Sequence, residues 1–180
     1  MSDPGPEVHP SEIARRGEIR RIGAERFGVA AATLASAYRA DPLVAWSLAA
    51  DTAVLGAEAH ERYWRGVLWG LPAGSEVHAT YGVEAVALWR PADHTAVPGG
   101  RAFELVALGV DPASRGRGLA RRLAEVMFAR ADRLGAALVA CLAADGTRDL
   151  TAIGGVVRVR SEPVADGGPT VVEYLREPAR

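Results

Sequence analysis

The stretch "ELVALGVDPASRGRGLARRLAEVMFARADRLG", residues 104–135, decides the fold, because a turn rich in glycine and arginine joins an apolar run to a helical pattern. The apolar run that ends at Val110 is typical of a strand. From Leu119 onward apolar residues recur at helical spacing, and Gly135 is typical of the residue that follows a helix. The stretch therefore predicts a strand, a turn and a helix in direct succession.

The turn between these two elements has the features of an anion site. A helix N-terminus leaves several backbone N–H groups unpaired, and the helix dipole adds positive potential there. Gly116 and Gly118 lack Cβ atoms, so the backbone can approach a bulky anion closely. Four arginines add charge and paired N–H donors: Arg115, Arg117, Arg121 and Arg122. The turn predicts a phosphate site; the alternative is an ordinary glycine turn before a surface helix with solvated arginines.

Length and composition predict a single domain. The chain has 180 residues, of which 49% are hydrophobic, and this is enough for one sizeable core but cramped for two. Residues 1–16 are rich in proline, glycine and charge, which is typical of a flexible tail. We therefore expect a flexible segment over residues 1–16 and one domain over residues 17–180.

Charge and cysteine content narrow the partners and the compartment. A formal net charge of −1 provides no overall basic field, which argues against nucleic acid or an anionic membrane as a partner. The chain begins without a signal-peptide pattern, and no apolar run reaches membrane-spanning length. The single Cys141 rules out an internal disulfide and is most simply a buried small hydrophobe, and the scattered histidines predict no metal site. We expect a soluble cytoplasmic protein, either a monomer or a homodimer.

The rest of the chain predicts helices first and strands later. A helix begins at Phe27 and ends before Pro42, and a longer one follows over residues 51–71. Strands are predicted over residues 17–22, 75–82, 83–89, 136–143, 154–162 and 169–177, with a loop over 90–100. This order predicts an α/β fold: a mixed, mostly antiparallel sheet of about six or seven strands, flanked by about four helices.

The residues of the turn also carry a family resemblance. "VDPASRGRGLA", residues 110–120, resembles the signature of the GNAT N-acetyltransferase superfamily, in which Val-x-Pro precedes Arg/Gln-x-x-Gly-x-Gly/Ala. Arg115, Gly118 and Ala120 fill the last three fixed positions. Three further stretches are similar to that family's first helix end, third strand and last strand: "YRADPLVAW" (38–46), "VALWRP" (86–91) and "VVEYLREP" (171–178). The resemblance extends over residues 17–176 and implies a GNAT-like fold.

The resemblance also implies a cosubstrate, acetyl-CoA or another acyl-CoA. Its pantetheine arm would bond to the backbone at Leu108 and Val110, on either side of Gly109. Its pyrophosphate would rest on the turn, which comprises Arg115, Gly116, Arg117, Gly118, Leu119, Ala120 and Arg121. The family builds its acceptor pocket from the first two helices and the strand before the turn, so Trp46 and Trp89 are candidates for lining it, although the four tryptophans are mostly expected in the core.

Glu104 is the candidate general base. An amine attacks a thioester only as the free base, so the site needs a route for the ammonium proton and a donor for the oxyanion. Glu104 lies in the strand that borders the acyl group, and some histone-acetylating members of the superfamily resemble this chain in having Glu there. The alternative is a charged residue on the solvent side of a half-exposed strand. A backbone N–H near Val110 is the expected oxyanion donor.

The chain departs from the family where a general acid is expected. Family members carry Asn-x-x-x-Tyr and then Gly-Phe after the fifth strand, whereas "DGTRDLTAIGGVVRV" (145–159) has no Asn, Tyr or Phe. Thr151 or Leu150 stands near the tyrosine position. The substitutes are Tyr174, Tyr81, Cys141 or water.

We therefore expect an acetyl-CoA-dependent N-acetyltransferase that transfers an acetyl group directly to a primary amine of a small molecule or peptide. Two alternatives remain. One is a degenerate family member that binds acyl-CoA without transfer, as a sensor or regulatory module. The other is a non-enzymatic interaction domain that uses the same turn to bind an anion.

Overall fold

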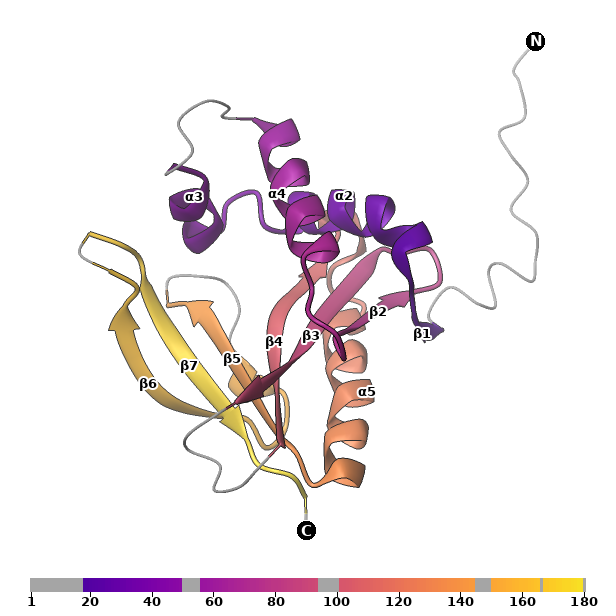
Figure 1. The fold of residues 1–180 in the computed structure, drawn as a ribbon, viewed down its shortest axis with the longest axis vertical. Helices are drawn as coiled ribbons and strands as arrows, with labels where there is room; N and C mark the ends of the chain where they lie inside the picture. The colour runs from indigo at the N-terminus through magenta and orange to yellow at the C-terminus, as the bar shows by residue number, and fades with distance from the viewer. Residues whose placement is uncertain (1–17, 50–55, 94–100, 145–149, 166, 180) are drawn as a thin grey trace.

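The computed structural model describes residues 18–49, 56–93, 101–144, 150–165 and 167–179 (Figure 1). Seven strands form one sheet in the order β1-β2-β3-β4-β5-β7-β6, and all neighbours are antiparallel except the parallel pair β4 and β5. The strands are β1 (Ile19–Arg21), β2 (Glu76–Thr80), β3 (Ala85–Asp93), β4 (Arg101–Val110), β5 (Ala137–Ala143), β6 (Val157–Pro163) and β7 (Thr170–Arg176). The predicted mixed, mostly antiparallel sheet is confirmed. The expected tail over residues 1–16 lies outside the described residues.

Four α-helices accompany the sheet in the described part of the chain: α2 (Phe27–Ala37), α3 (Pro42–Ala49), α4 (Ala57–Trp69) and α5 (Leu119–Leu134). Short 3-10 turns are η1 (Ala24–Arg26), η2 (Pro112–Ser114) and η3 (Leu150–Ala152). None of the helices in this part of the chain is long and apolar enough to cross a membrane. The predicted succession of strand, turn and helix is present as β4, η2 and α5.

Helix α3 was not predicted, because Asp41-Pro42 was taken only as the end of the preceding helix. In the structure the same dipeptide begins a new helix. The Asp41 carboxylate accepts hydrogen bonds from the backbone N–H groups of Leu43 (3.1 Å) and Val44 (3.2 Å). Pro42 occupies the first helical position, where its missing N–H costs nothing. The pair therefore caps α3, whereas α2 already ends at Ala37.

Each face of the sheet has its own hydrophobic core. On one face α2 and α4 pack against β2, β3 and β4, and the fully buried Leu34 and the nearly buried Leu68 belong to this core. Helix α5 covers the other face of the sheet (Figure 1). Its Leu123 and Met127 side chains are fully buried in that core. Burying a side chain of this size contributes about 1.5–3 kcal/mol, so the two cores account for much of the stability of this part of the molecule.

Several exposure predictions were wrong. Cys141 is exposed rather than buried, because it points to the sheet face opposite α5. The alternation of Val and Arg in residues 157–160 is typical of a half-exposed strand. All seven residues of β6 are nevertheless exposed, because β6 is an edge strand that has only β7 beside it. Trp46 (40%) and Trp69 (57%) are exposed rather than in the core. Residues 90–93, predicted as loop, continue β3.

Candidate active site

The site begins where β4 and β5 separate. Their parallel pairing ends at Leu105 and Ala140, although β4 continues to Val110 and β5 to Ala143. The register of β3 against β4 shifts at the same place, and Val106 is the extra residue of a β-bulge. A bulge bends its strand and increases the local twist, so the end of β4 turns away from β5. The result is a wedge-shaped gap in the sheet.

Two residues of β4 direct their backbone groups into this gap. The Asp111 N–H donates to the Glu84 carbonyl (2.8 Å), toward β3. Because backbone groups alternate in direction along a strand, those of Gly109 also face β3, and those of Leu108 and Val110 face the gap. No strand of the described chain pairs with this side of β4 beyond Leu105.

A groove of about 640 Å³ lies at the open end of the gap, within the usual size range of ligand sites. It is lined by Leu108, Val110, Ser114, Arg115, Gly116, Gly118, Leu119, Ala120, Arg121, Leu142, Leu150, Ala152 and Ile153. All the residues predicted to hold the cosubstrate line this groove except Gly109 and Arg117. Residues from one continuous segment therefore form one wall, and β5 and η3 form the other.

The glycines of the turn are required by its backbone. Gly116 (φ +77°) and Gly118 (φ +71°) are both in the left-handed region, which other residues rarely adopt. A Cβ atom on either glycine would meet no heavy atom within 4 Å, so the space beside them is open. Gly118 caps α5, and no side chain caps the first-turn N–H groups of that helix. The turn therefore leaves donors and space for an anion.

The arginines of the turn are partly engaged. The Arg115 guanidinium donates to the Ala37 carbonyl (3.3 Å), which ties the turn to the end of α2. Arg121 forms an exposed ion pair with Glu125 (2.9 Å), one helical turn away. Gly109 has a packing role, because a Cβ atom there would lie 2.8 Å from Leu34 Cδ2.

A second pocket, of about 650 Å³, lies on the sheet face that α2 and α4 cover. It is lined by Ser47, Leu48, Ala59, Arg62, Tyr63, Gly66, Val67, Gly70, Leu71, Pro72, Arg90 and Val106. Burial raises the pKa of Tyr63, although a hydrogen bond with the Ser47 side chain opposes the increase. Neither Trp46 nor Trp89 lines this pocket, and its polar residues were not recognised from the sequence because they come from separate segments.

Glu104 lies beside this second pocket. Its carboxylate pairs across the strands with the Arg90 guanidinium, at 2.6 Å from Nη2 and 2.7 Å from Nε. The Glu104 side chain is 27% exposed. Since Arg90 lines the pocket, the Glu104 carboxylate contacts one of the residues that form its wall.

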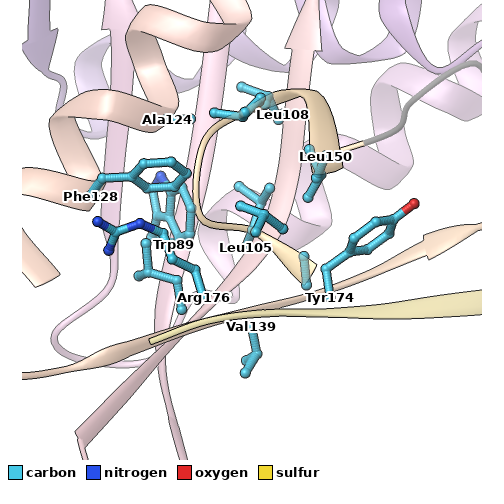
Figure 2. Close-up of a pocket in the computed structure, with 13 residues that line it drawn as sticks. Trp89, Leu105, Leu108, Ala124, Phe128, Val139, Leu150, Tyr174 and Arg176 are labelled. Atoms are coloured by element: carbon cyan, nitrogen blue, oxygen red, sulfur yellow. The ribbon is translucent and has the colours of Figure 1, made fainter. Parts of the chain in front are cut away.

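The region after β5 has an apolar character. Leu150 is buried in η3, and Thr151 is exposed. Figure 2 shows Tyr174 and Leu150 among the residues that line a small pocket of about 20 Å³, whose other walls include Trp89 and Phe128. Tyr174 lies on the α5 side of the sheet and belongs to that core.

A further hydroxyl, which the sequence did not reveal, reaches the gap from α2. The Tyr38 hydroxyl accepts a hydrogen bond from the Leu108 N–H (2.9 Å) and donates one to the Leu108 carbonyl (3.3 Å). In the sequence Tyr38 is only the first residue of "YRADPLVAW", the stretch similar to the end of the family's first helix. No local pattern could have found this contact, because it joins residues 70 positions apart.

A seven-stranded sheet with a bulged β4, a gap before β5 and a glycine-arginine turn defines a protein with the GNAT acetyltransferase fold. The model of the acetyltransferase (GNAT) family matches residues 33–152, and the chain belongs to this family. No curated protein matches the sequence significantly.

Several solved structures share the fold at low sequence identity. A structure described as histone acetyltransferase HPA2 and related acetyltransferase, from Corynebacterium glutamicum, is 17% identical with a TM-score of 0.66, over 90% of this chain and 96% of that one. Ribosomal-protein-alanine N-acetyltransferase from Brucella melitensis is 17% identical with a TM-score of 0.60, over 88% and 98%. A chain of the NatC complex bound to Gag peptide and CoA is 11% identical with a TM-score of 0.58, over 89% and 98%.

Proposed function

We propose that the protein is an acetyl-CoA-dependent N-acetyltransferase that transfers the acetyl group directly to a primary amine of a small molecule or peptide. One observation carries this proposal: the groove and the second pocket approach the β4 bulge from opposite faces of the sheet. Leu108 lines the groove, and Val106, two residues earlier, lines the pocket. A donor in the groove and an amine in the pocket would therefore meet at the bulge.

The groove suits a CoA thioester. The uncapped first turn of α5, with Gly116, Gly118 and the Arg115 guanidinium, would hold the pyrophosphate. The Val110 backbone groups face the gap and would bond the pantetheine arm as a neighbouring strand would. The Leu108 N–H also faces the gap, and it would donate a hydrogen bond to the oxygen of the acyl group. A thioester bound in this way would have its carbonyl carbon at the bulge.

Glu104 would act as the general base. The neutral amine attacks the carbonyl carbon, and the nitrogen then loses a proton that a carboxylate at the edge of the pocket can accept. In the free protein the Glu104 carboxylate pairs with Arg90, so the acceptor amine must compete with the Arg90 guanidinium for this carboxylate. CoA leaves as a thiolate, which a water molecule that enters the groove can protonate.

Calorimetry with acetyl-CoA, followed by a thiol-release assay with a panel of amines, tests the proposal. The panel should contain acidic, neutral and cationic small amines and a peptide N-terminus. We expect saturable binding of acetyl-CoA and amine-dependent release of CoA. Binding without release from any amine would favour the sensor instead, and binding of inorganic pyrophosphate but not of acetyl-CoA would favour the anion-binding domain.

A further inference from the structure

Tyr38 lies at the C-terminal end of α2 and is almost completely buried, with 4% of its surface exposed. Its ring packs against the Trp64 indole, with ring centroids 4.8 Å apart. The hydroxyl group leaves this apolar environment and bonds to both backbone groups of Leu108. A buried tyrosine normally finds a partner for its hydroxyl, but here that partner is the backbone that borders the gap.

The packing around Tyr38 directs the hydroxyl to this place. Gly109 has no side chain, and a Cβ atom there would lie 2.8 Å from Leu34 Cδ2, 3.0 Å from Ala37 Cβ and 3.4 Å from Tyr38 Cε2. The end of α2 therefore lies directly against β4. The Leu108 N–H and C=O face the gap, where a neighbouring strand would otherwise bond them, and one hydroxyl now bonds both.

This position is also where the two cavities approach each other. Leu108 lines the groove and Val106 lines the pocket, whereas Tyr38 lines neither. The Tyr38 ring comes from the core on the pocket side of the sheet, and its hydroxyl ends at the Leu108 backbone groups, on the edge of β4 that borders the gap. An acyl group that is attacked from the pocket while its CoA lies in the groove must pass its carbonyl group next to this hydroxyl.

We propose, on the basis of the proposed function, that the Tyr38 hydroxyl is a second hydrogen-bond donor to the acyl oxygen, beside the Leu108 N–H. The amine nitrogen bonds to the carbonyl carbon, and the π electron pair moves to the oxygen, which accepts hydrogen bonds from both donors. The pair then re-forms the carbonyl, the C–S bond breaks, and CoA leaves as a thiolate. Overall one proton passes from the amine to the thiolate, so the Tyr38 hydroxyl keeps its own proton throughout.

The exchange of partners at Leu108 follows from hydrogen-bond capacity. In the free protein the Leu108 N–H donates to the tyrosine oxygen. When the acyl oxygen takes that N–H, the hydroxyl loses this donor, and its one hydrogen, which the free protein donates over 3.3 Å to the Leu108 carbonyl, would turn to the acyl oxygen beside it. Two donors on one oxygen polarise the carbonyl before attack.

The infrared carbonyl stretch of bound acetyl-CoA, labelled with ¹³C at the acetyl carbonyl, tests this proposal without any acceptor. We expect the wild-type protein to lower the stretching frequency relative to free acetyl-CoA. Tyr38→Phe should lose about half of that lowering, because one of two donors is removed, while the dissociation constant stays within about threefold. Tyr63→Phe, which removes a hydroxyl from the second pocket next to Trp64, should leave the frequency unchanged.

The same carbonyl frequency in wild type and Tyr38→Phe would overturn the proposal, since the hydroxyl would then be only a partner of the Leu108 backbone. If Tyr38→Phe does not fold, 3-fluorotyrosine introduced at position 38 keeps the hydroxyl and makes it a stronger donor. The frequency should then fall further, and an unchanged frequency would refute the role. If the wild type does not bind acetyl-CoA in calorimetry, the proposed function fails first and this inference falls with it.

Discussion

The groove and the second pocket are nearly equal in volume, at about 640 and 650 Å³, but the chain builds them in different ways. One wall of the groove comes from a single segment, residues 108–121, and consists largely of backbone and glycine. The pocket collects side chains from α3, α4, the segment after α4, β3 and β4. A surface made by backbone in a fixed conformation needs a local motif, whereas a surface made by distant side chains needs the whole fold.

If backbone groups form the binding surface of the groove, the largest loss of acetyl-CoA binding should come from a substitution that places a side chain in the turn. Gly118→Asp adds a Cβ atom and a negative charge at φ +71°, beside the uncapped N-terminus of α5. We expect acetyl-CoA to bind roughly 10²- to 10³-fold more weakly in calorimetry, on the scale of a lost charge-assisted contact plus repulsion.

Gly135→Asp is the matched control for this change. Gly135 follows the C-terminus of the same helix, has φ +60° and also has open space around it. The control carries a similar backbone strain, so it should lower thermal stability but leave acetyl-CoA binding at the wild-type value. Equal loss of binding in both variants would mean that α5 is disturbed as a whole, and the turn would not be the phosphate site.

The same contrast explains how much the sequence could predict. The succession of β4, turn and α5 was predicted because periodicity, glycine and arginine are all read within about thirty residues. Eight-residue α3 is apolar on most sides, so its periodicity is weak, and its only signal was the Asp41 cap before Pro42. The full exposure of β6 could not be predicted, because the alternation of valine and arginine does not say whether another element covers the strand.

In the candidate site, too, local features could be predicted and contacts between distant residues could not. The motif predicted where the turn lies, and the turn lines the groove. The pairing of Arg90 with Glu104 depends instead on the register of β3 against β4. The contact of Tyr38 with Leu108 depends on the missing side chain of Gly109 and on the path of α2. Contacts of this kind are set by packing between elements, and no local spacing encodes them.

Beside the second pocket, Glu104→Gln should lower the rate of transfer without weakening the binding of acetyl-CoA in the groove. The change is nearly isosteric and removes the proton acceptor, so kcat at neutral pH should fall by roughly 10² while the acetyl-CoA dissociation constant stays within about threefold. Part of the loss should return at high pH, where more of the amine is already deprotonated. Glu61→Gln, in an exposed pair with Arg65 on α4, is the control. A rate independent of this substitution at every pH would show that Glu104 is not the base.

Within the groove, side chains should contribute less to acetyl-CoA binding than the backbone of the turn does. Arg115→Ala removes one guanidinium that also bonds the Ala37 carbonyl, and we expect acetyl-CoA to bind about tenfold more weakly, as for one lost charged hydrogen bond. Arg158→Ala, on the edge strand β6, should leave binding unchanged. Calorimetry on the two variants compares them directly, and equal effects would count against the placement of the pyrophosphate at the turn.

The smallest effect should come from narrowing the second pocket. It should change the KM of the acceptor amine and leave acetyl-CoA binding unchanged. Gly66 lies in α4 and lines the pocket, and a Cβ atom there would meet nothing within 4 Å, so a larger side chain can enter the pocket without disturbing the core. Gly66→Phe should raise the KM of a bulky amine about fivefold, the scale of a lost apolar contact, while acetyl-CoA binds as in the wild type. Gly66→Ala should change neither value appreciably, since one methyl group leaves most of the pocket open. If Gly66→Phe weakens acetyl-CoA instead and leaves the amine KM unchanged, the pocket is not the entry of the acceptor, and the division of the two substrates between the faces of the sheet is wrong.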